Sequence, residues 1–487
     1  MARYFRPNTE TKTGAFIVKA LISVLALYSL YLILLNFICA VSCKAVSYAG
    51  YAALALILFA FACFIAYKAE VSPAAFVLAV FVLGFLTKSI PAFLTDIKPV
   101  SDFDVFYQYA LKLLNGGRSL EDMEYFRTWA YQTGPVIYYA ALMKLFGTGL
   151  LTLKLANCFF MAGTNVFIYL IARKISNDYT ARAVSLLYLL YPAPYFLAPV
   201  LTNQHFAACM FLSSIYVLLI ERLNWAVKGI LAGAVIAVGN TVRPIGIVII
   251  AASIIWEIIE IIRSGKLLKT GSVIMLLLSY LLVSYGCSAA VKHADINSEG
   301  LANNFPLWKF VVGLNYEAKG QFSYEDEYEI YRIQDFNKRN KAAEQVIKQR
   351  LSVGIKKLAG LMNAKQIAMW AGSDTLSWGF YQQIDGQLVP SEEVKKIEPI
   401  ILKSEKMYYI FIFILMLAGF CRSAWENKIN HGVALLSLIL LCYFGIHFFI
   451  EIQVRYRYFA MTIVFILAAK GCEAVFYSLR EYRERYP

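Results

Sequence analysis

The sequence predicts an all-α polytopic membrane protein, and three observations support this fold class. Of the 487 residues, 60% are hydrophobic and only 16% are charged, whereas about 25% of the residues of a soluble domain are charged. The mean hydropathy is +0.58. Apolar runs long enough to cross a bilayer recur along the whole chain, and they are continuous rather than alternating, which indicates helices.

The apolar runs and the basic residues between them predict about 12 transmembrane helices, with both termini cytoplasmic. Residues 1–95 hold three of them, at 14–39, 46–67 and 73–95. Residues 96–149 then form an extracytoplasmic loop, in which 134–147 lies at the membrane interface. Residues 150–292 hold six spans, which are 150–172, 181–201, 203–222, 226–241, 243–262 and 271–291.

The remainder of the chain divides into an outer segment and a last group of spans. Residues 293–405 are predicted to be extracytoplasmic. Residues 406–487 contain spans at 406–422, 431–451 and 454–478, followed by a cytoplasmic tail. We expect a multi-pass protein of the plasma membrane.

Composition also limits the partners. The net charge of +14 and the pI of about 9.2 are explained by Lys and Arg in cytoplasmic loops, so we do not expect nucleic acid as a partner. The nine Cys show no CxxC or Cys/His metal-binding spacing and are predicted to be free thiols. No tight metal site is expected.

The segment "PVSDFDVFYQYALKLLNGG" (99–117) opens the first polar interruption. Its apolar residues follow helical spacing from Phe103 onward, so it predicts an amphipathic helix on the outer membrane surface. Ser101 and Asp104 have the spacing of a capping box. Capping accounts well for Asp104 but only weakly for Asp102, so Asp102 is the better candidate for a catalytic base. Asp104 is expected to be mainly the cap, with a secondary role at the site.

Four further segments carry a resemblance to a known family. They are "YFRTWAYQTGPVIYYAALMKLFG" (125–147), "GNTVRPIGIVIIAASI" (239–254), "PLWKFVVGLNYEAKGQFS" (306–323) and "EIQVRYRYFAMTIVFILAA" (451–469). With the acidic helix before them, and in this order, they resemble the GT-C glycosyltransferases, in particular the family 39, protein-mannosyltransferase-like branch. The sequence departs from that pattern in three places: three spans precede the acidic loop instead of one, Asp102-Phe103-Asp104 replaces an Asp-Glu pair, and Gly134-Pro135 replaces Pro-Pro.

The resemblance implies a GT-C-like bundle with extracytoplasmic juxtamembrane helices and a small outer domain. It also implies an activity, the inverting transfer of a sugar from a polyprenyl-phosphate carrier to a glycan, lipid or protein acceptor outside the membrane. Such a reaction needs a carboxylate base for the acceptor hydroxyl and cations for the departing lipid phosphate. The candidate bases are Asp102 and Asp104, which could also hold a weakly bound divalent metal ion.

The candidate cations are Arg243, Arg455 and Arg457, because a guanidinium can bind phosphate through two donors. Alternatively, Arg243 is an anchor at an outer turn, and Arg455 and Arg457 reach the lipid headgroups or pair with Glu451. The residues Asn203, Gln204 and His205 could line the same cavity, or they form a plain polar loop. The basic stretch 335–362 suits an amphipathic helix against anionic lipid, or an ordinary solvated helix.

Two other functions compete with the enzyme. A transporter or flippase of a lipid-linked glycan should show internal repeats and ionisable residues near the middle of its spans. The sequence has no clear repeat, and most charges stand at the ends of spans. A scaffold without activity would not need this clustering of charge on one side. The enzyme is therefore favoured.

Overall fold

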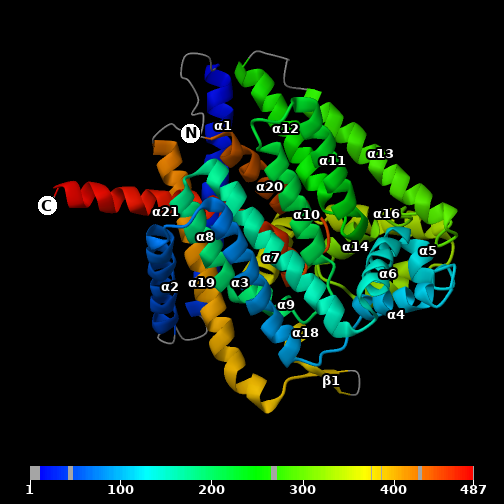
Figure 1. Ribbon diagram of the computed structural model, residues 1–487. Helices are drawn as coiled ribbons and strands as arrows, with labels where there is room; N and C mark the ends of the chain where they lie inside the picture. The colour runs from blue at the N-terminus through cyan, green and yellow to red at the C-terminus, as the bar shows by residue number, and fades with distance from the viewer. Residues whose placement is uncertain are drawn as a thin grey trace.

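The computed structural model describes residues 11–41, 48–264, 271–373, 376–384, 387–425 and 430–485, and most of them are helical (Figure 1). In the described part of the chain, eight helices are long and apolar enough to cross a membrane. They are α1 (Lys12–Val41), α2 (Ala49–Lys68), α3 (Pro73–Leu94), α7 (Leu150–Ile175), α11 (Trp225–Val242), α13 (Gly271–His293), α19 (Glu392–Trp425) and α21 (Arg457–Arg485).

The predicted runs coincide with these helices, but the predicted number of about 12 spans is not confirmed. Two apolar helices are shorter, namely α10 (Gln204–Leu218) and α20 (His431–His447). In α12 (Gly246–Ser264), three charged residues, Glu257, Glu260 and Arg263, interrupt the apolar run.

The predicted span 181–201 consists of two helices, α8 (Asp178–Leu190) and α9 (Pro192–Leu197). Between them, Tyr191 has an extended backbone with φ −69° and ψ 123°. A residue that precedes proline is driven out of the helical region by the proline ring. The chain therefore bends at Tyr191-Pro192.

Polar contacts join several helix ends at one end of the bundle. The backbone N–H of Thr11 donates to the Arg263 carbonyl at 3.0 Å. The Asn430 side chain donates to the Lys174 carbonyl at 3.4 Å. These ends belong to the turns that the charge pattern predicts to be cytoplasmic. Residues 1–10, on which the predicted orientation also rests, lie outside the described residues.

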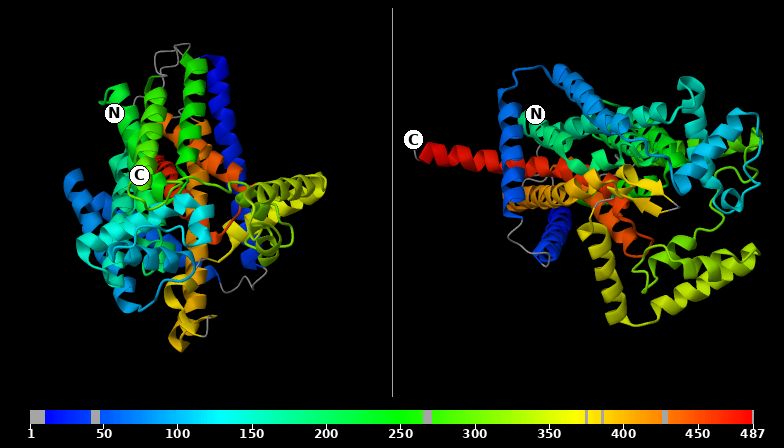
Figure 2. Two further views of the ribbon diagram at one scale, coloured as in Figure 1. Left: turned by 90° about the vertical axis from the view of Figure 1, so that its right-hand side faces the viewer. Right: turned by 90° about the horizontal axis from the view of Figure 1, so that it is seen from below.

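The two predicted outer segments meet each other at the opposite end (Figures 1 and 2). The Leu120 N–H donates to the Ile296 carbonyl at 3.0 Å, and the Tyr131 N–H donates to the Ala302 carbonyl at 2.8 Å. The first segment contains α4 (Asp102–Leu114), α5 (Glu124–Thr128), η3 (Ala130–Gln132) and α6 (Thr133–Phe146).

The second segment contains short helices and one small antiparallel sheet. The elements are α14 (Trp308–Gly313), α15 (Tyr324–Asp326), η5 (Glu327–Tyr331), α16 (Phe336–Leu351), α17 (Ile355–Gln366), η6 (Ile367–Ala371), α18 (Ser377–Phe380), β1 (Gln382–Ile384) and β2 (Gln387–Val389). The next helix, α19, begins at Glu392 and therefore runs through the predicted boundary at residue 405.

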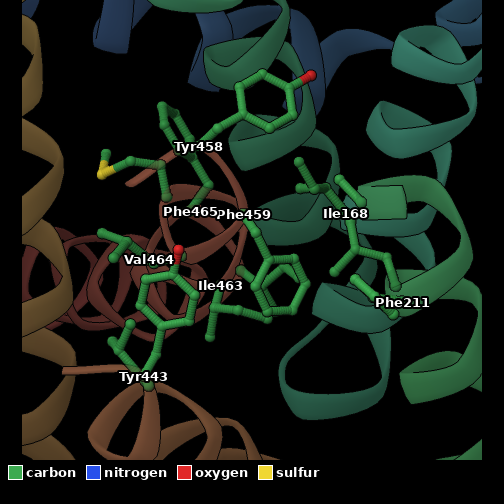
Figure 3. Close-up of a cluster of buried hydrophobic side chains, with 14 of the residues drawn as sticks. Ile168, Phe211, Tyr443, Tyr458, Phe459, Ile463, Val464 and Phe465 are labelled. Carbon is green, nitrogen blue, oxygen red and sulfur yellow. The ribbon is translucent and has the colours of Figure 1, made fainter. Parts of the chain in front are cut away.

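The helix α21 lies in the core of the bundle, where aromatic and branched side chains such as Phe459, Ile463 and Phe465 are fully buried (Figure 3). It packs against α7, α8 and α19. A Cβ atom at Gly471 would lie 1.8 Å from the Leu415 carbonyl oxygen, so the α19 and α21 backbones touch there. The short helix η7 (Val454–Tyr456), which precedes α21, is therefore attached to a rigid element.

Candidate active site

A cavity of about 250 Å³ lies where the two outer segments meet the ends of the spans. Its walls come from α4, η3, the α11–α12 turn, α14, the end of α20 and η7. The polar residues that line it are Asp102, Tyr131, Gln132, Asn203, Arg243, Lys309, Tyr443, His447, Glu451, Arg455 and Tyr456. We call it the polar cavity.

The two candidate bases lie in different environments. Asp102, the first residue of α4, lines the polar cavity. Asp104 does not line it and accepts a hydrogen bond from the Gln108 side chain at 3.1 Å. The predicted capping box is wrong, because Ser101 has φ 54° instead of the extended backbone of a usual N-cap and its side chain makes no capping hydrogen bond.

The surroundings of Asp102 are aromatic. Phe103 and Phe106 are buried on the inner face of α4 and fix the helix. Burial raises the pKa of Tyr125 well above its ordinary value, and the neighbouring Asp102 carboxylate adds to the rise. The phenol therefore stays protonated beside the acid. In the described residues, no Lys, Arg or His forms an ion pair with Asp102.

Arg243 stands at the turn between α11 and α12, as predicted. The helix α11 ends at Val242, and Pro244 prevents its continuation. The Arg243 guanidinium donates to the Asn203 side-chain oxygen at 3.5 Å and lies 5.1 Å from the centre of the Tyr456 ring. The Asn203 amide in turn donates to the Val242 carbonyl. Asn203 therefore links Arg243 to the end of α11.

Arg455 approaches the same cavity from η7. Its Nε donates to the Gln453 side-chain oxygen at 2.6 Å, and its guanidinium lies 4.8 Å from the Trp378 ring and 4.9 Å from the Phe103 ring. Across the described ranges, neither Arg243 nor Arg455 forms an ion pair with a carboxylate. Two guanidinium groups thus line one cavity without a carboxylate at ion-pair distance in the described part of the chain.

Arg457 is placed differently, although it is only two residues further along. It is 2% exposed and does not line the polar cavity. Its Nη2 lies 3.6 Å from a Glu405 carboxylate oxygen, and its Nη1 donates to the Gly372 carbonyl at 3.3 Å. These contacts join α21 to α19 and to the end of η6, so the position of Arg457 is that of a structural residue.

Of the predicted polar group at 203–205, only Asn203 lines the polar cavity. His205 is fully buried, with one ring nitrogen 2.9 Å from the Tyr458 hydroxyl and the other 3.1 Å from the Leu197 carbonyl. Gln204 is also buried, at the first turn of α10. The segment is therefore the start of a packed helix and not an exposed polar loop.

Sequence reasoning missed one ion pair in the cavity wall, between Lys309 of α14 and Glu451. The Glu451 N–H also donates to the Lys309 carbonyl at 2.8 Å. Burial alone would raise the pKa of Glu451, but the Lys309 ammonium holds that pKa below its ordinary value. The same carboxylate outweighs the effect of burial on Lys309 and raises its pKa. Both groups are thus charged near neutral pH.

A second cavity, of about 410 Å³, lies between α6, α11 and α13. Its lining is almost entirely apolar and includes Ile137, Ala141, Ala290 and Val291, and it shares Val242 with the polar cavity. We call it the apolar cavity. A Cβ atom at Gly134 would lie 1.8 Å from the Thr241 carbonyl oxygen, so glycine is required where α6 meets the end of α11.

No group of three or more His, Cys, Asp or Glu side chains in the described part of the chain could hold a metal ion. In the polar cavity, Asp102 and Glu451 are the two carboxylates, and Glu451 is paired with Lys309. A weakly bound divalent ion at the acids remains a prediction.

The fold and the site define a helical membrane protein with a charged cavity at one end of its bundle and an apolar cavity beside it. No protein-family model and no curated protein matches the chain. Two solved structures of the Archaeoglobus fulgidus oligosaccharyltransferase resemble the chain. AglB in complex with an inhibitory peptide and a dolichol-phosphate has a TM-score of 0.44 and 11% identity. The apo form has a TM-score of 0.46 and 12% identity. In both comparisons, 84% of this chain and 51% of the other are covered, so the chain spans about half the length of these enzymes.

Proposed function

We propose that the chain is a glycosyltransferase that moves a sugar from a polyprenyl-phosphate carrier to an acceptor on the extracytoplasmic face of the membrane. One observation carries the proposal. Arg243 and Arg455 line a cavity without a carboxylate partner in the described residues, and Asp102, a carboxylate without a cationic partner there, lines the same cavity. Both arginines are half-buried, and a bound anion stabilises a cation that has lost part of its hydration.

The charge of the cavity fits a lipid phosphate. Three cations (Arg243, Arg455 and Lys309) and two carboxylates (Asp102 and Glu451) leave one net positive charge. A sugar-phosphate-lipid diester carries one negative charge and would neutralise it. When the sugar leaves, the phosphate gains a second negative charge, which two guanidinium groups can stabilise through several donors.

The apolar cavity could hold the prenyl chain of the donor next to the phosphate. It lies between helices of the bundle and reaches Val242, the residue before Arg243. A prenyl chain there would bury apolar surface while its phosphate meets Arg243. A soluble nucleotide-sugar would have no use for this second cavity.

The proposed reaction uses Asp102 as the base. The oxygen of the acceptor hydroxyl attacks the anomeric carbon and forms the new glycosidic bond. Its proton passes to the Asp102 carboxylate, the bond from the anomeric carbon to the phosphate oxygen breaks, and the electron pair stays on the phosphate. Attack opposite the phosphate inverts the configuration. The protonated Tyr125 beside Asp102 would be a hydrogen-bond donor for this carboxylate.

The test is to incubate the purified protein in lipid with a panel of polyprenyl-phosphate sugars and to measure the release of lipid phosphate. We expect release with at least one donor and loss of donor binding in the variants Arg243→Ala and Arg455→Ala. Arg332→Ala is the control, because Arg332 lies on the outer segment, is exposed and pairs with Glu327. Movement of intact labelled donor across a liposome membrane without release would instead favour a transporter or flippase.

A further inference from the structure

The turn between α16 and α17 and the helix ends beside it, residues 351–357, expose apolar side chains outside the predicted spans. Leu351 is 42% exposed, Val353 36% and Ile355 80%. Lys356 and Lys357 follow directly and are also exposed. We call residues 351–357 the tip, and α16, the tip and α17 together the α16–α17 hairpin. Apolar residues beside lysines are typical of a segment that lies at a membrane surface.

The exposure of the tip does not come from a loosely held segment. The Arg350 guanidinium, directly before the tip, pairs with Asp326 at 2.6 Å. The Tyr316 hydroxyl donates to the Arg350 carbonyl at 2.6 Å. Gly354 has φ +90°, a conformation that glycine adopts without strain and that turns the chain into α17. The apolar side chains are thus held outward by a fixed turn.

The hairpin lies alongside the bundle rather than beyond its end. The Tyr31 hydroxyl of α1 donates to the Asn363 side chain of α17 at 2.7 Å, and Tyr28 donates to Gln366. From Tyr31, α1 continues to Val41, which at 1.5 Å per residue is about 15 Å of helix. Figure 2 shows α16 and α17 extending sideways from the bundle, where lipid surrounds a membrane protein.

The charge of the hairpin favours anionic lipid. Its two arginines are used in ion pairs, Arg339 with Glu124 and Arg350 with Asp326. Its exposed cations are all lysines, Lys338, Lys341, Lys348, Lys356 and Lys357. Between residues 336 and 366 the only acidic residue is Glu344. This excess of positive charge would attract anionic headgroups.

We propose that the tip inserts into the lipid interface beside the bundle and binds anionic phospholipid. Leu351, Val353 and Ile355 enter the boundary between headgroups and acyl chains, while Lys356 and Lys357 contact headgroup phosphates. This proposal is independent of the proposed transfer reaction, since it rests on the hairpin alone.

Photo-crosslinking tests the proposal in the full-length protein. Benzoylphenylalanine is placed at position 355 and, as the matched control, at position 344, where Glu344 is exposed on α16. Both proteins are embedded in nanodiscs of equal phosphatidylglycerol and phosphatidylcholine, irradiated and analysed by mass spectrometry. We expect at least fivefold more lipid adduct at 355 than at 344, with phosphatidylglycerol at least twofold over-represented.

The basic residues are tested in the same assay. The double variant Lys356→Gln, Lys357→Gln should keep the adducts at 355 but lose the preference for phosphatidylglycerol, and an unchanged thermal unfolding temperature shows that the fold is kept. Equal lipid adduct at 355 and 344 would overturn the insertion, as would adducts at 355 that join two protein chains. A wild-type tip without preference for phosphatidylglycerol would overturn the anionic selectivity.

Discussion

Replacing Asp102 by Asn removes one of the two negative charges of the polar cavity while it keeps the size of the side chain. Loss of a general base costs about 10²–10⁴-fold in rate, which is about 2.7–5.4 kcal/mol in the activation barrier. The cost in stability is smaller. A carboxylate in the first turn of a helix contributes about 0.3–1 kcal/mol through the helix dipole, and Asp102 forms no ion pair within the described residues. The variant should therefore fold, bind the donor and transfer almost no sugar.

Asp104→Asn on the same helix is the matched control. Asp104 does not line the cavity, and its carboxylate accepts from Gln108 one turn further along α4. Such a helical pair contributes about 0.2–0.5 kcal/mol to stability, which corresponds to about a twofold change at most in the unfolding equilibrium constant. An Asn oxygen can accept the same hydrogen bond. The turnover of this variant should stay within about twofold of the wild type.

The assay measures two quantities for each protein, the equilibrium binding of the donor and the rate at which lipid phosphate is released. Asp102→Asn should change the rate and not the binding. Equal rates for Asp102→Asn and the wild type would refute Asp102 as the base. A rate lost in Asp104→Asn but kept in Asp102→Asn would move the base to Asp104.

Four further expectations concern stability and membrane orientation. Gly134→Ala should lower the free energy of unfolding by about 1–3 kcal/mol, measured by denaturation in detergent, because a Cβ atom has no room there. Arg457→Met should lower the unfolding temperature with unchanged donor affinity, because Glu405 loses the positive charge of Arg457, and adding Glu405→Leu should restore it. Burial lowers the pKa of Lys365 from 10.5 to about 7. Between these pH values the unfolded chain binds more protons than the folded protein, so the free energy of unfolding should rise from pH 7 to pH 10. The unfolding temperature of Lys365→Met should rise less over the same pH range. A thiol reagent that does not cross membranes should label Ser119→Cys in intact cells above the background of the unsubstituted protein; absence of labelling would reject the predicted orientation.

Most of the helices could be predicted because a continuous apolar run has few alternatives to a helix in a membrane. The details that were not predicted depend on backbone angles or on partners far away in the sequence. The spacing of Ser101 and Asp104 predicts a capping box, but the positive φ of Ser101 directs the chain differently. The hairpin of α16 and α17 was predicted as a basic amphipathic stretch, whereas its turn at Gly354 was not.

The polar cavity was predicted in part for a similar reason. Asp102, Arg243 and Arg455 were all candidates, and the fold brings them to one cavity. The ion pair of Lys309 and Glu451 joins residues that are 142 positions apart, and no local sequence pattern indicates it. The alternation "RYR" offers two equivalent arginines, yet the turn at η7 directs Arg455 to the cavity and leaves Arg457 inside the protein.

The arginines fall into two groups according to whether a carboxylate lies at ion-pair distance. Among the described residues, each fully buried arginine has a carboxylate nearby, in the pairs Arg182–Asp178, Arg263–Glu260, Arg339–Glu124 and Arg457–Glu405. The protein itself balances these charges. Arg243 and Arg455 are held by neutral groups, an Asn and a Gln side chain and aromatic rings, which orient a guanidinium without neutralising it. Two like charges in one cavity repel each other. The Asp102 and Glu451 carboxylates in the same cavity offset part of this repulsion, and a bound phosphate would offset more of it.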